Sequence, residues 1–356
     1  MSDILRRGLP PLLAVVAGAG LGTLAMAETD PAGLELQTRF DPIGAEVHEM
    51  KHGERAVYFI DEGPRDGRVT VFIGGQGTSL EAFQLTEFAR STREALGLRM
   101  ISVERNGFGE SPFDPALGYQ DYAAEVLAVL DARGVDRFSI IAISGGGAYA
   151  AHLAQAAGER LVSLHLAVAS SRTLPNRTEP NCTRTPEGAL ETYGAYTRSP
   201  KDWWGVPGSP VLVIPGWQAR AYADATRSFY VAGQMGDPAA LAHEYLLPCG
   251  DKAIADVSGV TAPVYLYYGE ADTSVPVDHM KEWQAAVQNV AKATVYPGEG
   301  HTAQYRHWDQ ILVDLAGLGD HTVVCQDGRS RLVPNAEVAA DAFLGICAWK
   351  DAQLPK

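Results

Sequence analysis

Ser144 is the residue whose neighbours point most directly to chemistry. It lies in the segment AISGGGA (142–148), after a β-branched apolar run and before a stretch with helical spacing. A serine on a sharp turn from strand to helix takes a strained conformation that exposes its hydroxyl, and small residues two positions away on each side let the strand and the helix approach closely. Ala142 and Gly146 are such small residues. The pattern therefore favours a nucleophilic serine over a serine in a flexible turn.

A serine hydroxyl becomes a good nucleophile only when an oriented base takes its proton. GEGHTAQ offers His301 after the last strand-like segment of the alternating region, and YYGEADTSVP offers Asp272 after the preceding one. The order Ser, Asp, His, with each residue at the C-terminal end of a strand, places all three at the edge where parallel sheets bind ligands. Two alternatives stay open: His307 as the base and Glu270 as the acid.

Alternating strand-like and helix-like segments are expected to position these residues. The expected strands are 56–63, 69–75, 99–105, 137–144, 161–169, 262–270 and 293–298. The expected helices are 80–96, 119–134, 146–158, about 277–290 and about 302–316. This alternation predicts an α/β fold, with a mostly parallel sheet and helices on both faces.

Residues 172–258 break the alternation, because they are rich in Pro, Trp, Tyr and Arg and show no strand–helix rhythm. We expect this block to be a cap inserted over the strand ends. Trp203, Trp204 and Trp217 are its candidates for lining an apolar acyl or aryl pocket. The alternative is that these side chains form the small core of the cap itself.

Several motifs together resemble the α/β-hydrolase fold family, over about residues 55–316 apart from the cap. Besides the elbow AISGGG, in which Ala142 stands where glycine is usual, GEAD followed by VP matches the family's acid motif and GEGH matches its histidine motif. The resemblance implies an α/β-hydrolase fold with an inserted cap. It also implies catalytic roles for Ser144, Asp272 and His301.

Two further segments resemble loops of that family. FIGGQGTS is similar to its HGxG-type oxyanion loop, with Gly74 where histidine is usual, and ERNGFGES is similar to its DRxGxGxS loop, with Glu104 in place of aspartate. By this resemblance, the backbone N–H groups of Gln76 and Gly145 would form the oxyanion hole. Gly145 also lies at a helix N-terminus, where negative charge is favoured.

The resemblance implies that Ser144 attacks an acyl carbonyl while His301 takes its proton and Asp272 orients the histidine. Water then releases the acid, and no metal or organic cofactor is needed. Relatives that open epoxides or displace halide use an aspartate at the elbow, so the serine argues against both. Carboxylic ester hydrolysis is the leading activity, with an amidase, peptidase or carbon–carbon bond hydrolase on the same triad as alternatives. A non-catalytic binding protein of this fold is the alternative from another class.

Residues 1–27 resemble a signal peptide for export. A short positive segment, MSDILRRG, precedes an apolar run, and Ala25-Met26-Ala27 forms a small-x-small cleavage site before Glu28. The apolar run is short for a membrane span and contains two prolines. We therefore expect an exported protein, periplasmic or secreted, without a stable membrane anchor; an uncleaved N-terminal anchor is the alternative.

Four cysteines, Cys182, Cys249, Cys325 and Cys347, follow that segment. An even number in an oxidising compartment predicts disulfides. Three pairings are possible, and Cys182–Cys249 with Cys325–Cys347 is favoured because each pair then lies within one segment. Free buried thiols are the alternative. The expected organisation is a signal peptide (1–27), a core (28–171 and 259–317), a cap (172–258) and a disulfide-stapled C-terminal appendage (318–356).

Composition narrows the partners. The chain has 356 residues and a formal net charge of -14, and it contains no run rich in Lys and Arg. Nucleic acids and anionic membrane surfaces need clustered positive charge, so neither is expected as a partner. No two cysteines lie close together and the other histidines match no ligand spacing, so no metal site is expected. The expected partner is a small ester with an apolar acyl or aryl group, and the oligomeric state stays open.

Overall fold

A computed structural model describes residues 31–175, 180–193, 212–220, 223 and 238–352. The expected signal peptide (1–27) and two candidate pocket residues, Trp203 and Trp204, lie outside the described residues. Those three expectations therefore stay predictions.

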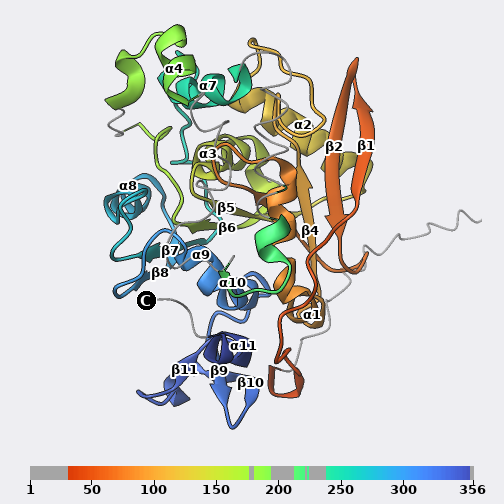
Figure 1. Ribbon diagram of the computed structural model, residues 1–356, viewed down its shortest axis with the longest axis vertical. Helices are drawn as coiled ribbons and strands as arrows, with labels where there is room; N and C mark the ends of the chain where they lie inside the picture. The colour runs from red at the N-terminus through yellow and green to blue at the C-terminus, as the bar shows by residue number, and fades with distance from the viewer. Residues whose placement is uncertain (1–30, 176–179, 194–211, 221–222, 224–237, 353–356) are drawn as a thin grey trace, which may run out of the picture. The chain divides into compact units, whose positions relative to one another are not determined.

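An eight-stranded sheet forms the centre of the fold (Figure 1). Its strands are β1 (Val47–His52), β2 (Arg55–Glu62), β3 (Arg68–Ile73), β4 (Leu98–Val103), β5 (Phe138–Ile143), β6 (Leu161–Ala167), β7 (Val264–Gly269) and β8 (Val290–Tyr296). The order is β1-β2-β4-β3-β5-β6-β7-β8, with β1–β2 and β2–β4 antiparallel and every other pair parallel. The mostly parallel sheet expected from the sequence is confirmed. Strand β1 was not expected, because its residues VHEMKH are mostly polar and occupy an exposed edge.

Helices cover both faces of the sheet and enclose two hydrophobic cores. They are the 3₁₀ helix η2 (Leu80–Ala89), α1 (Arg90–Ala95), α2 (Tyr119–Ala132), α3 (Gly146–Ala157), α8 (Asp278–Ala286), α9 (Ala303–Arg306) and α10 (Trp308–Leu315). One core lies under α2, α3 and α8, and the other under η2 and α10. The helix expected over 302–316 divides at His307 into α9 and α10, and the one expected over 80–96 is mostly 3₁₀.

Two helices of the block 172–258, here called the cap helices, pack against each other beside α3 (Figure 1). They are α4 (Pro186–Tyr193) and α7 (Ala239–Leu246), and they share a small core with Phe108. Short 3₁₀ turns flank them, η4 (Pro180–Thr183) and η7 (Leu247–Cys249). The disulfide Cys182–Cys249 joins these turns, which is the pairing that the sequence favours.

Trp217 takes a different position from the one expected for a pocket residue. It is 1% exposed and packs edge-on against Tyr305, with ring centroids 5.0 Å apart, and at a tilt against Phe88, at 5.8 Å. These partners belong to the core under η2 and α10. The structure therefore places Trp217 in that core and not on an open wall, because its indole fills the space between the two aromatic rings.

The C-terminal appendage docks on the core. It contains β9 (His321–Gln326), β10 (Arg329–Pro334), β11 (Phe343–Leu344) and α11 (Cys347–Asp351), with the expected disulfide Cys325–Cys347. Strands β9 and β10 form a hairpin that turns at Asp327 and Gly328, which take φ values of 52° and 73°. Helix α10 supplies the anchors: Asp309 Oδ2 accepts from Ile346 N–H at 2.6 Å, and Gln310 Oε1 accepts from Val323 N–H at 3.0 Å.

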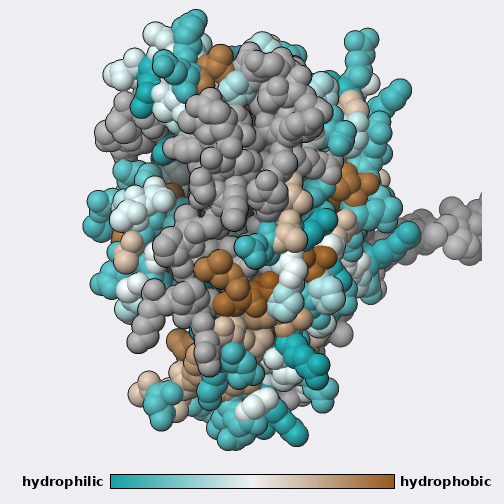
Figure 2. All heavy atoms as spheres, in the orientation of Figure 1, coloured by the Kyte–Doolittle hydropathy of each residue, from teal (hydrophilic) through white to brown (hydrophobic). Residues whose placement is uncertain are grey.

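One face of the molecule shows how polar and apolar side chains are distributed. Figure 2 shows hydrophilic side chains over most of the described part of one face, with hydrophobic side chains gathered in a smaller area above the appendage. Within the described residues, no helix is both long and apolar enough to cross a membrane.

A polar network runs through the buried interior beside β6. Ser163 Oγ lies 2.9 Å from His165 Nε2, His165 Nδ1 lies 3.1 Å from the Tyr267 hydroxyl, and that hydroxyl donates to Asp314 Oδ2 at 2.8 Å. Since the Tyr267 proton is used on Asp314, His165 donates from Nδ1 and accepts at Nε2. Burial, with a smaller effect of Lys292, lowers the pKa of His165 to about 3, so the folded protein holds this histidine neutral.

His165 should make the folded state sensitive to acid. Between pH 6.5 and about 3 the unfolded chain protonates this histidine and the folded chain does not. The unfolded state binds more protons there, so stability falls as the pH falls, by about 2 kcal/mol at pH 5 from this residue. His165→Gln should remove that part of the loss, measured by urea unfolding at pH 7 and pH 5. Equal pH dependence in both proteins would contradict the assignment.

Candidate active site

Ser144 occupies a strained turn between β5 and α3. Its φ is 51°, in the left-handed region that residues with a side chain rarely adopt. The turn is held by its own carbonyl oxygen, which accepts from Gly147 N–H at 3.2 Å and from Ser170 N–H at 2.7 Å. The arrangement leaves the serine half-buried at the carboxyl end of β5, where the sequence predicts a nucleophile.

The three glycines after Ser144 are needed for close packing. A Cβ on Gly145 would lie 2.4 Å from Gln76 Cβ, one on Gly146 would lie 2.6 Å from the Gly74 carbonyl oxygen, and one on Gly147 would lie 2.2 Å from the Ser170 carbonyl oxygen. Real Cβ atoms essentially never come so close. The run GGG therefore lets the first turn of α3 contact the loops that follow β3 and β6.

His301 and Asp272 lie in line with the serine. His301 Nε2 is 3.0 Å from Ser144 Oγ, and His301 Nδ1 is 2.8 Å from Asp272 Oδ2. The other oxygen of Asp272 accepts from the N–H groups of Ser274 and Val275, at 2.8 and 3.0 Å. These bonds hold a fully buried carboxylate on Nδ1 and leave Nε2 to face the serine. This is the arrangement that deprotonates a serine as it attacks.

The alternative base and acid have other partners. His307 Nε2 pairs with Glu299 Oε1 at 2.8 Å, and its ring stacks on Tyr296 with centroids 3.5 Å apart. Glu270 accepts from Gly298 N–H at 2.9 Å. The structure brings neither residue to the serine, whereas it brings both His301 and Asp272 there.

The loop after β3 lies directly against the elbow. A Cβ on Gly75 would lie 3.3 Å from Ser144 Cβ, and a Cβ on Gly145 would lie 2.8 Å from the backbone nitrogen of Gln76. In the described part of the chain, neither the Gln76 N–H nor the Gly145 N–H donates to a protein acceptor. Two backbone N–H groups beside Ser144 have the placement that an oxyanion hole requires.

Arg105 supports this loop and was not singled out from the sequence. Its guanidinium is buried, donates to the carbonyl oxygens of Gly75 and Thr78, and lies over the ring of Tyr149, 5.1 Å from its centroid. Glu104, the replacement noted in ERNGFGES, accepts from the N–H groups of Leu80 and Arg105 at 2.9 and 3.1 Å. The motif ERNGFGES is the sequence feature that pointed to this segment. In the structure, Glu104 and Arg105 of the motif hold the loop that follows β3 through its backbone.

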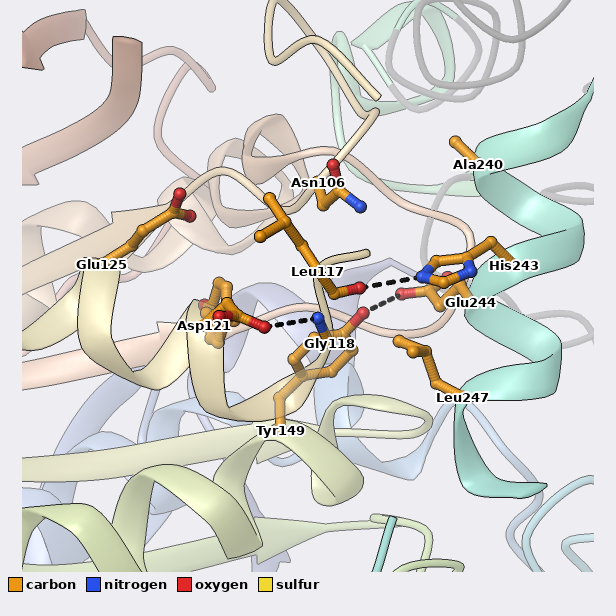
Figure 3. A pocket seen from close by; sticks show the side chains of 11 residues that line it. Asn106, Leu117, Gly118, Asp121, Glu125, Tyr149, Ala240, His243, Glu244 and Leu247 are labelled. Carbon is orange, nitrogen blue, oxygen red and sulfur yellow. Dashed lines mark hydrogen bonds between the residues drawn. The ribbon is translucent and has the colours of Figure 1, made fainter. Parts of the chain in front are cut away.

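A small cavity lies between α2, α3 and α7 (Figure 3). It measures about 10 Å³, which is room for one water molecule. Tyr149, His243 and Glu244 are among its lining residues, and none of Ser144, Asp272 and His301 is. It is too small for an organic substrate. In the part of the chain that the structure describes, no group of three His, Cys, Asp or Glu residues could hold a metal ion.

Known proteins share this architecture. The family model described as "Alpha/beta hydrolase family" matches residues 70–315, which leaves the appendage outside the match. No curated protein sequence matches the chain.

Solved structures agree in fold over the same region. A hydrolase from Pseudomonas aeruginosa aligns with a TM-score of 0.59 and 17% identity, over 76% of this chain and 98% of that one. A bromoperoxidase from Bacillus anthracis aligns with 0.60 and 18%, over 77% and 100%. A 2-hydroxy-6-oxo-6-phenylhexa-2,4-dienoate hydrolase from a Rhodococcus strain aligns with 0.57 and 16%, over 77% and 99%. At these identities the likeness concerns the fold.

Gly145→Ala should push the loop that follows β3 away from the turn at Ser144. The backbone φ of Gly145 is -60°, which suits alanine, so only the contact with Gln76 is tested. Displacing one oxyanion donor should slow the reaction of Ser144 with a fluorophosphonate about 100-fold. Gly259→Ala is the control, because a Cβ there meets nothing within 4 Å. Equal labelling rates in the two variants, both folded by circular dichroism, would refute the contact's importance.

Proposed function

This chain belongs to the α/β hydrolase family, and from that premise we propose that it hydrolyses carboxylic esters through Ser144, His301 and Asp272. The observation that carries the proposal is the line of two hydrogen bonds, 3.0 Å from His301 to Ser144 and 2.8 Å from His301 to Asp272. A strained serine, an oriented base and a buried acid converge at the carboxyl edge of the sheet. That convergence supports an enzyme over a binding protein of the same fold.

In the first half of the proposed reaction, Ser144 Oγ attacks the acyl carbon as His301 Nε2 takes its proton. The carbonyl oxygen becomes an oxyanion that accepts from the N–H groups of Gln76 and Gly145, each worth about 3 kcal/mol in the transition state. His301 then gives the proton to the alkoxide, the carbon–oxygen bond breaks and the alcohol leaves. Asp272 stabilises the histidine while it carries the positive charge.

In the second half, water attacks the acyl-serine and His301 takes its proton. The same two N–H groups hold the second oxyanion. His301 returns the proton to Ser144 Oγ, and the carboxylic acid is released. Every proton therefore passes through one nitrogen, Nε2 of His301.

An ester is the least demanding substrate for this machinery. The alkoxide leaves with one proton from His301, whereas an amide nitrogen is a poorer leaving group and depends more strictly on protonation. The serine at position 144 also supports acyl transfer over epoxide opening. Members of the α/β-hydrolase family that open epoxides use an aspartate at the corresponding position. We therefore place ester hydrolysis first, on a small molecule with an apolar acyl or aryl group.

The two disulfides support a place of action outside the reducing cytosol. Cys182–Cys249 and Cys325–Cys347 account for every cysteine of the chain. Disulfides persist in the periplasm and in secreted proteins and are rare where thiols are kept reduced. We propose that the protein is exported, with residues 1–27 as the signal.

Ser144 should be the residue that a fluorophosphonate labels. The chain offers a matched control in Ser171, whose hydroxyl lies 2.7 Å from His279 Nδ1 and also contacts Glu282, but whose residue is 0% exposed. Peptide mass spectrometry should place the adduct on Ser144 and not on Ser171. Ser144→Ala should lower kcat on p-nitrophenyl butyrate by about 10⁴-fold or more.

Ser171→Ala should keep kcat within about 3-fold of the unsubstituted protein. Folded protein that takes no adduct and hydrolyses no ester would refute the proposal and favour the binding-protein alternative.

Asp272→Asn should lower kcat by about 10³- to 10⁴-fold, because an amide cannot hold the histidine in the required tautomer or stabilise its positive charge. The amide oxygen can still accept from Ser274 and Val275, so the fold should persist. Glu270→Gln tests the alternative acid and should leave kcat within about 3-fold. A larger loss for Glu270→Gln than for Asp272→Asn would reverse the two assignments.

A further inference from the structure

Glu244 is a buried carboxylate of cap helix α7 that reaches the loop beside Ser144. The residue is 2% exposed, and its Oε2 accepts from Gly77 N–H at 2.6 Å. Gly77 directly follows Gln76, one of the two proposed oxyanion donors. Glu244 and Gly77 are 167 positions apart in the sequence, so only the folded cap brings this carboxylate to the loop.

The second carboxylate oxygen binds two more side chains. Oε1 lies 2.6 Å from Arg105 Nη1 and accepts from the Tyr149 hydroxyl at 3.2 Å, and Figure 3 shows the latter bond between α3 and α7. Burial raises the pKa of Tyr149 well above its ordinary value, and the charge of Glu244 adds to the shift. The phenol therefore keeps the proton that it donates. The backbone oxygen of Glu244 also accepts from Gln76 Nε2, at 3.4 Å.

Arg105 and Glu244 together fix the two peptide groups on either side of Gln76. Arg105 Nη2 donates to the Gly75 carbonyl at 2.6 Å, and Glu244 accepts from the Gly77 N–H. In a trans peptide the C=O and the N–H point in opposite directions. The Gly75 carbonyl and the Gln76 N–H belong to one peptide group, so holding the carbonyl on Arg105 aims the N–H away from Arg105.

Helix α7 is itself held in place by the rest of the cap. Tyr245, the residue after Glu244, stacks on Tyr193 of α4 with ring centroids 3.6 Å apart. Cys249, which ends the turn after α7, is bonded to Cys182. The carboxylate is therefore carried on a helix with fixed neighbours.

We propose that Glu244 is a positioning residue, which holds Arg105 and Gly77 in the arrangement that keeps the Gln76 N–H aimed at the oxyanion. The inference rests on the proposed hydrolase function and deepens it, since the cap then contributes to transition-state stabilisation. Removal of the carboxylate leaves the buried guanidinium without its partner on α7 and releases the Gly77 peptide group. The oxyanion donor loses its support, while the nucleophile and the base keep theirs.

Glu244→Gln and Glu87→Gln form the matched pair that tests this. Glu87 is 1% exposed and pairs with Arg93 at 2.9 Å, and its hydrogen bonds go to Arg90 and Arg93 rather than to the loop. Each substitution removes a buried carboxylate that pairs with a buried arginine. On p-nitrophenyl butyrate, Glu244→Gln should lower kcat about 30-fold with KM within about 2-fold, and Glu87→Gln should leave kcat within about 2-fold.

Binding of phenylboronic acid gives a readout that does not need turnover. The Ser144 oxygen adds to the boron atom as its proton passes to His301, and the tetrahedral boronate that forms places one of its oxygens in the oxyanion hole. For Glu244→Gln, the Kd of this compound should rise by about the factor by which kcat falls, because both report the same oxyanion contacts. A merely structural role would lower Tm in both variants and leave this Kd unchanged in both.

Fluorophosphonate labelling of the unsubstituted chain distinguishes a failure of the role of Glu244 from a failure of the proposed hydrolase function. If Ser144 is labelled and Glu244→Gln keeps both kcat and Kd within 2-fold, this inference is overturned and the proposed function stands. If Ser144 of the folded protein is not labelled, the proposed function fails and this inference fails with it.

Glu244→Asp takes the place of Glu244→Gln if the latter does not fold. The shorter side chain keeps the charge beside Arg105 but withdraws the carboxylate from Gly77, so kcat should fall in this variant as well, by a smaller factor. An unchanged kcat in folded Glu244→Asp overturns the inference.

Discussion

The positive φ of Ser144 is the constraint on which the rest of the site depends. A side chain at φ 51° is unfavourable by about 1–3 kcal/mol, so the conformation persists only because its surroundings require it. The carbonyl oxygen of Ser144 is held from two sides, by Gly147 and by Ser170. The glycines that follow let the loops after β3 and β6 contact the first turn of α3. The strained backbone of Ser144 and the close packing of α3 against the loops after β3 and β6 therefore depend on each other.

Buried charge then holds the loop that faces the serine. Glu104, Arg105 and Glu244 are each 3% exposed or less, and their contacts reach the backbone of Gly75, Gly77, Thr78 and Leu80. In a low-dielectric interior, such contacts are strong when complete, and removal of one partner costs about 3–5 kcal/mol. The loop is consequently held in one arrangement before any substrate arrives, which is the condition under which fixed dipoles stabilise a transition state.

The segment that carries His301 is supported from the opposite direction. Helix α9 begins two residues after the histidine, and Arg306 at its end donates to the Leu344 carbonyl of the appendage at 3.0 Å. Helix α10 receives the appendage through Asp309 and Gln310. The family match ends at residue 315, so this support comes from a part of the chain beyond the shared fold. Each half of the site is thus braced by an element that carries its own disulfide.

The sequence by itself determined the parallel sheet and the proximity of Ser144, Asp272 and His301. Each of these residues follows a strand, and parallel strands end at a common edge, so local pattern was enough. Only the tertiary structure decided that Trp217 fills the core and that Glu244 binds the loop that follows β3. The sequence pattern of an amphipathic helix is the same whether one of its glutamates faces solvent or a buried arginine. The difference lies in how the cap packs across 167 residues of chain, a distance at which no local periodicity carries information.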